Sequence, residues 1–180
     1  MIVRQNSECE SSSKVLSEWI GLCEQALLKA HQGSPSDLER LSLKLATDSR
    51  LPSELLLRVA QFLMERGALD QALKIYQRSL VLDSDCVEIW FALGCIYHCK
   101  GQFSQAVAYY DGALIRKPDE SSIHSNLAST LLALNQPHKA LYHAETALVL
   151  APGLAEASYN RALSLERTFD KKKAEASYDR

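Results

Sequence analysis

Residues 87–118 read VEIWFALGCIYHCKGQFSQAVAYYDGALIRKP, and this stretch sets the register of most of the chain. Counted from Val87 as position 1, positions 8, 20 and 27 are small, namely Gly94, Ala106 and Ala113. Large apolar side chains stand between them, at Trp90, Leu93, Tyr97, Phe103 and Tyr110. Two antiparallel helices pack closely only where small residues let their backbones approach and large groups fill the remaining spaces. The stretch therefore predicts a helical hairpin, with a turn at Gly101.

The same residue types recur every 34 residues. One series of alanines consists of Ala72, Ala106, Ala140 and Ala174. A second series is small throughout, at Ala60, Gly94, Ala128 and Ala162. A third is large and apolar, at Leu63, Tyr97, Leu131 and Leu165. This pattern resembles the tetratricopeptide-repeat family, whose unit is a helix–turn–helix of about 34 residues.

The resemblance implies an all-α fold, a right-handed α-solenoid of tetratricopeptide helix–turn–helix repeats with an N-terminal helical cap. The expected repeats are 53–86, 87–120, 121–154 and an incomplete 155–180. Phe169 stands at the turn position of the fourth repeat, and about ten residues of a second helix are expected to follow it. Either the chain continues into a longer repeat protein or a partner covers this end. The uncapped last repeat also suggests self-association.

Two segments precede the repeats. Residues 1–13 are polar and rich in serine, which predicts a disordered tail. Residues 14–52 predict a helical hairpin, with an apolar stripe that includes Trp19 and Leu22 and a second helix that begins near Ser34. We interpret this hairpin as a degenerate repeat or cap, because a solenoid needs atypical ends to cover its apolar faces.

The composition excludes several classes of function. A net charge of −2 over 180 residues gives no reason to expect a nucleic-acid or membrane-surface partner. The five cysteines are odd in number and lack a scaffold-like spacing, which indicates reduced thiols and a cytoplasmic protein. No phosphate-binding loop, nucleophile elbow or zinc-protease helix is present, so neither catalysis nor a cofactor is expected. Cys95, His98 and Cys99 share one helical turn but lack a fourth ligand, so we predict no metal site.

The family resemblance places a peptide-binding groove on the concave face, lined by the first helix of each repeat. The residues expected to bind peptide are Leu57, Arg58, Glu88, Phe91, Asn126, Ser129, Tyr159 and Asn160. Glu occupies position 2 in three of the four repeats, so we expect no clamp for a C-terminal carboxylate. The lining carries five acidic side chains against two arginines, which favours a neutral to mildly basic peptide.

Two features of this lining leave alternatives open. Asn126 and Asn160 hold the same position in successive repeats, and an amide can pair with the backbone of an extended peptide. This resembles the asparagine ladder in the repeat region of O-GlcNAc transferases; the alternative is that both residues are simple solvated polar groups on a helix face. Phe91 and Tyr159 are candidate aromatic anchors, or could pack on neighbouring helices.

The sequence therefore predicts a non-enzymatic protein–protein interaction scaffold that binds a peptide or partner helix. Two alternatives remain. One is the substrate-recruiting repeat region of a larger enzyme such as a glycosyltransferase. The other is a protein similar to type III secretion chaperones, which carry three such repeats.

Overall fold

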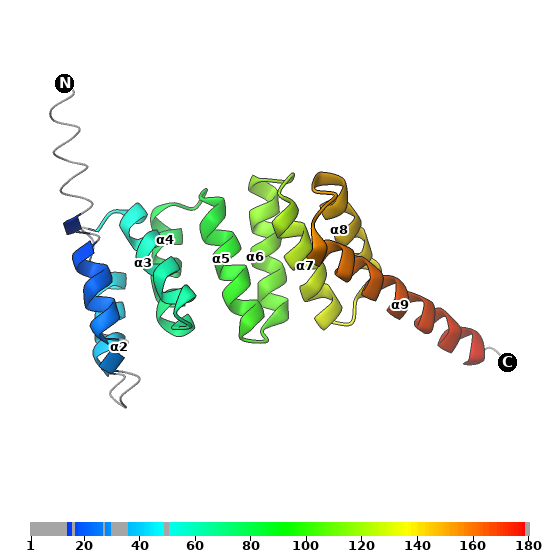
Figure 1. Ribbon diagram of the computed structural model, residues 1–180, viewed down its shortest axis with the longest axis horizontal. Helices are drawn as coiled ribbons and strands as arrows, with labels where there is room; N and C mark the ends of the chain where they lie inside the picture. Colours follow the sequence, from blue (N-terminus) through cyan, green and yellow to red (C-terminus); the bar gives the residue numbers. More distant parts are fainter. Residues whose placement is uncertain (1–13, 16, 27, 30–35, 49–50, 179–180) are drawn as a thin grey trace, which may run out of the picture. The chain divides into compact units, whose positions relative to one another are not determined.

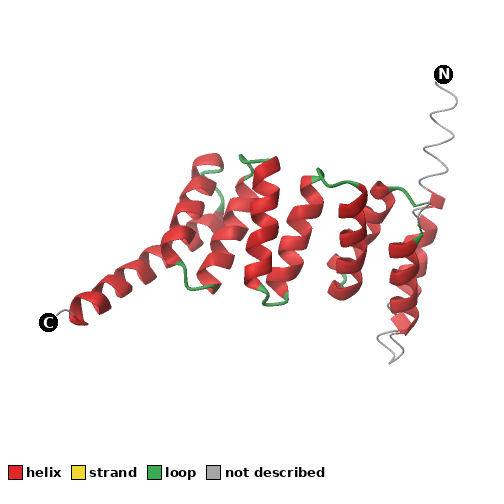
Figure 2. Ribbon diagram, turned by 180° about the vertical axis from the view of Figure 1, so that it is seen from behind, coloured by secondary structure: helices red, strands yellow, loops and turns green. Residues whose placement is uncertain are grey.

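The computed structural model describes residues 14–15, 17–26, 28–29, 36–48 and 51–178. The described part contains helices and loops but no strand, so the predicted all-α class is confirmed (Figure 2). Residues 14–15, 17–26 and 28–29 are helical. They are followed by α2 (Ser36–Thr47), α3 (Ser53–Glu65), α4 (Leu69–Leu82), α5 (Val87–Cys99), α6 (Phe103–Arg116), α7 (Ser121–Ala133), α8 (Pro137–Leu150) and α9 (Ala155–Tyr178) (Figure 1). The predicted tail at 1–13 lies outside the described residues.

The chain forms two compact units, Met1–Ile89 and Trp90–Arg180. In the first unit, α4 packs against both α2 and α3. In the second unit α6 packs against α7, α7 against α8, and α9 against both α7 and α8. Each unit is thus built from helical hairpins, and the second holds the candidate site.

Small residues occupy the helix crossings, as the register predicts. Ala60 and Ala72 are fully buried in the first unit, and Ala106, Ala128 and Ala140 in the second. Because these side chains take little space, the backbones of paired helices approach closely and the larger apolar groups fill the remaining volume.

Two glycines lie directly against aromatic rings, where a Cβ would overlap the ring. A Cβ on Gly94 would lie 2.5 Å from Cε1 of Tyr110, and one on Gly112 would lie 2.4 Å from Cε3 of Trp90. The Trp90 ring is also covered by the Arg116 guanidinium, 4.3 Å from the ring centroid. Sequence reasoning identified Gly94 through its 34-residue series but missed Gly112, which has no small counterpart in the other repeats.

The turns within the first three repeats share one backbone conformation. Gly67, Gly101 and Asn135 have φ of +77°, +71° and +55°, the left-handed region that glycine and asparagine tolerate best. At Gly101 the turn closes with two main-chain bonds, from its own N–H to the His98 carbonyl and from Gln102 N–H to the Tyr97 carbonyl, each 2.9 Å. This is the Schellman motif, which ends one helix and redirects the chain into the next.

Replacing Gly101 with alanine is expected to lower the free energy of unfolding by about 1 kcal/mol, because a Cβ disfavours the left-handed conformation. Urea unfolding would measure the loss. Gly153→Ala is the matched control: a Cβ there meets nothing within 4 Å and the residue lacks a positive φ. Equal losses in the two variants would contradict the role assigned to the turn.

The fourth repeat departs from the prediction. The expected turn at Phe169 is absent, and α9 continues as one helix from Ala155 to Tyr178 (Figure 1). Phe169 stands where the other repeats have Gly67, Gly101 and Asn135, and a bulky residue disfavours the left-handed conformation by about 1–2 kcal/mol. The chain therefore stays helical, and the expectation of a separate second helix here is wrong.

Candidate functional site

An open hollow of about 430 Å³ lies between the first turns of α9 and the middle of α7. Its lining residues are Ser125, Asn126, Ser129, Ala155, Glu156, Tyr159 and Asn160. Four of the eight predicted peptide-binding residues therefore meet here, namely Asn126, Ser129, Tyr159 and Asn160. Leu57, Arg58 and Glu88 belong to the first unit, and Phe91 belongs to the second but does not line the hollow.

The two asparagines are already engaged within the protein. Nδ2 of Asn160, a residue only 6% exposed, donates to the carbonyl of Ser125 at 3.0 Å. Nδ2 of Asn126 donates to the carbonyl of Ser122, one turn earlier on its own helix, also at 3.0 Å. One of the two N–H groups of each amide is thus used internally, and the second N–H and the amide oxygen remain for a ligand.

The two predicted aromatic anchors differ in exposure. Tyr159 is 69% exposed at the edge of the hollow. Phe91 is half-buried, and its ring lies 6.0 Å from that of Tyr110 between centroids. Tyr159 is therefore the aromatic side chain that a partner can reach at this site, whereas Phe91 packs within its own hairpin.

Side chains of α9 reach the main chain of α7. In addition to the Asn160 bond, Nη1 of Arg167 donates to the carbonyl of Leu132 at 2.7 Å. Each donor lies 35 residues after the residue that accepts, a spacing in the sequence that could have identified both links. The two bonds lie about two helical turns apart on α9, so they fix its position along α7 and hold the walls of the hollow in place.

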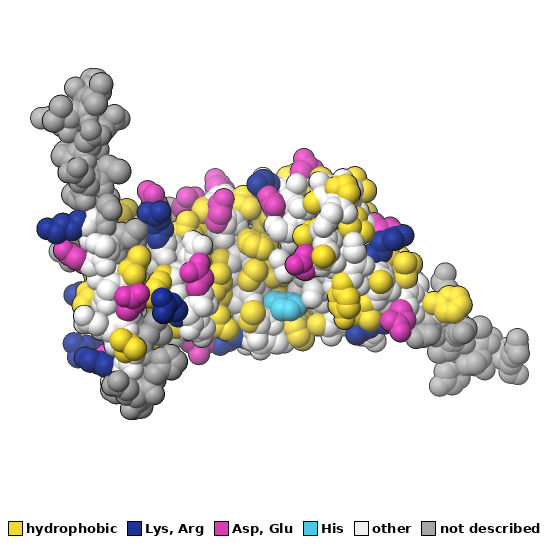
Figure 3. Space-filling view, viewed as in Figure 1, with side chains coloured by type: hydrophobic (Ala, Val, Ile, Leu, Met, Phe, Trp, Pro, Cys, Tyr) yellow, Lys and Arg dark blue, Asp and Glu magenta, His cyan; other side chains and the backbone are white. Residues whose placement is uncertain are grey.

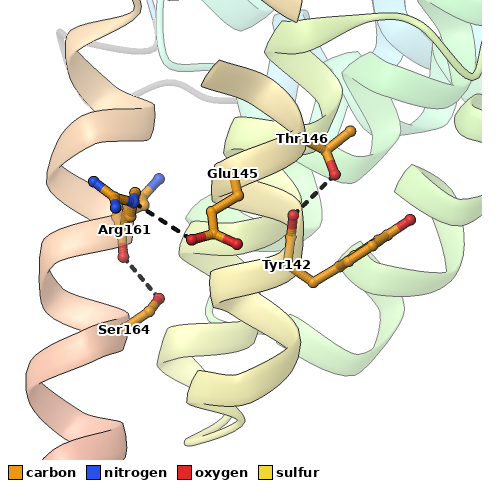
Figure 4. A network of polar contacts seen from close by, with 6 residues as sticks. Tyr142, Glu145, Thr146, Arg161 and Ser164 are labelled. Atoms are coloured by element: carbon orange, nitrogen blue, oxygen red, sulfur yellow. Dashed lines mark hydrogen bonds and ion pairs between the residues drawn. The ribbon is translucent and has the colours of Figure 1, made fainter. Parts of the chain in front are cut away.

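A neighbouring side of α9 contacts α8. Nε of Arg161 lies 3.5 Å from Oε1 of Glu145, and Thr146 bonds to the carbonyl of Tyr142 one turn earlier on α8 (Figure 4). Both members of the ion pair are about half exposed, so the pair adds little stability, in the range of about 0–1 kcal/mol. The two bonds from α9 to α7, one buried and one part-buried, are therefore the ones that determine the geometry of the hollow.

A pair of histidines, one buried and one half-buried, lies between α7 and α8. Nε2 of His124 lies 2.9 Å from the carbonyl of Pro118, and its Nδ1 lies 3.0 Å from Nδ1 of His143. A carbonyl only accepts, so Nε2 of His124 carries the proton and Nδ1 accepts from His143. Burial, followed by the charge of His124, lowers the pKa of His143 to about 4. The His143 ring is therefore neutral at pH 7.

The described residues show neither a metal-binding cluster nor a membrane-spanning helix. They contain no group of three His, Cys, Asp or Glu side chains that could hold a metal ion. Within the described residues, no helix is both long and apolar enough to cross a membrane. On the visible face, acidic, basic and apolar side chains are interspersed over the described part (Figure 3). The hollow between α7 and α9 is thus the candidate site that the geometry favours.

Comparison with known proteins gives the same fold. A family model described as tetratricopeptide repeat matches residues 57–121. The human protein O-mannosyl-transferase TMTC1 is 36% identical over 81 residues, which cover 45% of this chain and 9% of that protein. The chain therefore corresponds to a small part of that relative's length.

Solved structures extend the similarity of fold over most of the chain. A crystal structure of MamA superposes with a TM-score of 0.69 at 16% identity, covering 93% of this chain and 90% of that one. YrrB, a TPR protein with an unusual peptide-binding site, gives 0.61 at 23% identity, covering 69% and 64%. The first TPR of Spaghetti (RPAP3), bound to the HSP90 peptide SRMEEVD, gives 0.62 at 18% identity, covering 63% and 90%.

Proposed function

The chain is a tetratricopeptide-repeat protein, and from this premise we propose that it is a non-enzymatic scaffold that binds a peptide or partner helix between α7 and α9. One observation carries the proposal: an exposed Tyr159 stands beside a hollow whose walls are joined by the buried hydrogen bond from Asn160 to the carbonyl of Ser125. A rigid site of this kind loses little conformational entropy on binding. Two proteins of the same fold, YrrB and RPAP3, are described as having a peptide site or a bound peptide.

The lining of the hollow indicates the chemistry of the peptide. Glu156 is its one charged residue, and Ser125, Ser129 and the asparagine oxygens add polar groups that can accept hydrogen bonds. We therefore propose a neutral to mildly basic peptide, with an apolar or basic side chain against the Tyr159 ring. The thiols of Cys23, Cys86, Cys95 and Cys99 are unpaired, which supports a cytoplasmic location for the encounter.

The test is to select peptides from a random library and measure their affinity by fluorescence polarisation. Tyr159→Ala should weaken the selected peptides about tenfold or more, as expected for a central aromatic anchor. Tyr142→Ala is the matched control, because Tyr142 is 65% exposed on α8 and does not line the hollow. Binding that survives Tyr159→Ala, or that falls equally with Tyr142→Ala, would place the site elsewhere.

A second candidate function is favoured by the similarity to TMTC1, which is described as an O-mannosyl-transferase. In this proposal the chain is the part of a larger enzyme that recruits hydroxyl-bearing acceptor segments. The same library distinguishes the two candidates. Strong enrichment of serine and threonine at fixed positions would support recruitment of acceptors, and selection without such enrichment would support the plain scaffold.

We also propose that the last repeat mediates self-association. Leu165 is 44% exposed and Phe169 is 61% exposed, whereas the leucines at the equivalent place of Leu165 in the first and third repeats, Leu63 and Leu131, are buried. Large apolar groups left in water favour association that removes them from solvent.

A further inference from the structure

A groove of about 300 Å³ lies on the other side of α7 from the hollow, within the Trp90–Arg180 unit. We call it the α6–α8 groove, because α6 and α8 form its walls. Its floor consists of Leu127, Leu131 and Leu134 from α7, the helix that packs against both walls. These leucines lie about half a turn around α7 from the residues that line the hollow. The two cavities therefore present separate surfaces to a ligand.

One end of the α6–α8 groove offers hydrogen-bond donors. Ser104 is the second residue of α6, Gln136 is the N-cap of α8, and Lys139 is the third residue of α8. The hydroxyl and the amide can both donate, and the lysine ammonium can only donate. The first turns of α6 and α8 lie at this end, so the positive ends of two helix dipoles lie there as well. This end of the groove suits a carboxylate.

The other end of the groove offers acceptors. Burial raises the pKa of Asp111 and the charge of Lys139 lowers it in part, but no hydrogen bond to this carboxylate contributes. Across the groove, Nδ1 of His143 donates to His124, so the lone pair of the neutral His143 ring is on Nε2, away from that bond. An ammonium, which only donates, suits this end of the groove.

The donors and the acceptors stand at different levels along the groove. Because α6 and α8 are the second helices of successive repeats, residues 34 apart have equivalent levels. The three donor residues hold positions 16 to 19 of their repeats, whereas His143 and Asp111 hold positions 23 and 25. At a rise of about 1.5 Å per residue, the levels of Lys139 and Asp111 are about 9 Å apart. Val107, at position 21, lies between them on the wall.

We propose that the α6–α8 groove binds a ligand in which an aliphatic chain joins a carboxylate to an ammonium. The carboxylate meets Lys139, the ammonium meets Asp111 and Nε2 of His143, and the chain lies on the leucine floor. The opposite charges of the lining balance, as those of such a ligand do. A cavity of this volume is at the small end of ligand pockets, which suits a molecule the size of one amino acid. Two sources share this chemistry, a free ω-amino acid and the lysine at the C-terminus of a peptide.

The probe that tests the groove is 6-aminohexanoate, titrated into the full chain and followed by two-dimensional NMR. Saturable shifts are expected at amides of α6, α7 and α8 around the groove. Hexanoate and hexylamine each lack one of the two charged groups and should bind about tenfold more weakly. The shorter 4-aminobutanoate should also bind more weakly, because it cannot reach both ends.

Two variants identify which end holds which charge. Asp111→Asn should weaken 6-aminohexanoate and hexylamine about tenfold and leave hexanoate unchanged, whereas Lys139→Gln should weaken 6-aminohexanoate and hexanoate and leave hexylamine unchanged. Both positions are exposed, so both variants should fold, which circular dichroism would verify. Asp119→Asn is the matched control, because Asp119 is exposed in the loop before α7 and does not line the groove.

A short peptide that ends in lysine, compared with its C-terminal amide, distinguishes the two sources. Tighter binding of the free acid than of 6-aminohexanoate, lost on amidation, would assign the groove to protein C-termini. Weaker binding of the free acid would assign it to free ω-amino acids. The proposal would be overturned by an absence of saturable shifts at high millimolar probe, by equal affinity for 6-aminohexanoate and the two singly charged probes, or by affinities that neither variant changes.

The α6–α8 groove and the proposed peptide site can fail independently. Tyr159→Ala should bind 6-aminohexanoate as the wild type does, and Asp111→Asn should bind the library-selected peptides with unchanged affinity. A chain that selects peptides but ignores the amino acid probes would refute the groove and leave the scaffold function standing. The reverse result would refute the scaffold function and leave the groove standing.

Discussion

Gly94→Ala is expected to lower the free energy of unfolding by about 2 kcal/mol, although alanine is the better helix former by about 1 kcal/mol. The added Cβ would lie 2.5 Å from Cε1 and 2.6 Å from Cδ1 of Tyr110, well inside van der Waals contact. The Tyr110 ring cannot easily move away, since the residue is fully buried and its hydroxyl bonds to Sγ of Cys95. For a chain of this size, the loss corresponds to a fall in melting temperature of about 4–8 °C.

The control for Gly94→Ala uses the same substitution where there is room. Gly21 lies in a helical stretch, and a Cβ there meets nothing within 4 Å. Gly21→Ala should therefore raise the melting temperature slightly, through helix propensity alone. If both variants were stabilised, the close approach of α5 to the Tyr110 ring on α6 would be wrong.

Acidification from pH 7 to pH 4 is expected to lower the free energy of unfolding by about 1–2 kcal/mol through His143, a figure reduced for solvent screening because the ring is only half-buried. Its pKa in the folded chain is about 4, below the ordinary value of 6.5. Between these values the unfolded chain binds a proton that the folded chain does not, so stability is complete above pH 6.5 and falls as the pH approaches 4. Asp111 lines the same hollow as His143, and burial raises its pKa, so its titration opposes the trend in part.

His143→Gln tests this contribution, because glutamine does not titrate but can still donate a hydrogen bond to Nδ1 of His124. Its unfolding free energy, measured by urea titration at several pH values, should depend less steeply on pH than that of the wild type. His138→Gln is the matched control, since His138 is exposed on the same helix, and it should retain the wild-type slope. If the unfolding free energies of all three proteins depended on pH with the same slope, His143 would not be the source of the loss of stability in acid.

The fold could be predicted because its decisive residues act through size alone. Whether Ala60, Ala106 or Ala140 can sit at a helix crossing depends on the absence of a large side chain, which a sequence displays directly, and the period of 34 then gives the partner of each helix. Gly112 could not be predicted in this way, because it lies against a single ring, that of Trp90, and no glycine stands at the equivalent position of the other repeats. A contact that occurs in one repeat alone leaves no pattern at intervals of 34 residues.

The unbroken α9 helix and the burial of Asn160 could not be read from the repeat pattern. Phe169 stands at a turn position, but its side chain disfavours a positive φ. The helix therefore continues through this position instead of ending there. Asn160 was identified from its position, yet its burial and its bond to Ser125 depend on how closely α7 and α9 approach. Replacing it with alanine would therefore cost stability as well as any contact with a ligand, whereas Tyr159 tests binding more cleanly.

The bonds that hold α9 to α7 end on carbonyl oxygens of the main chain, at Ser125 and Leu132. Every amino acid supplies that same acceptor. Substitutions at these two positions can therefore accumulate during evolution without loss of the acceptors that anchor the neighbouring helix. Ser125 also lines the hollow, so related chains could acquire new ligand preferences there by drift or selection while the architecture around the hollow stays constant.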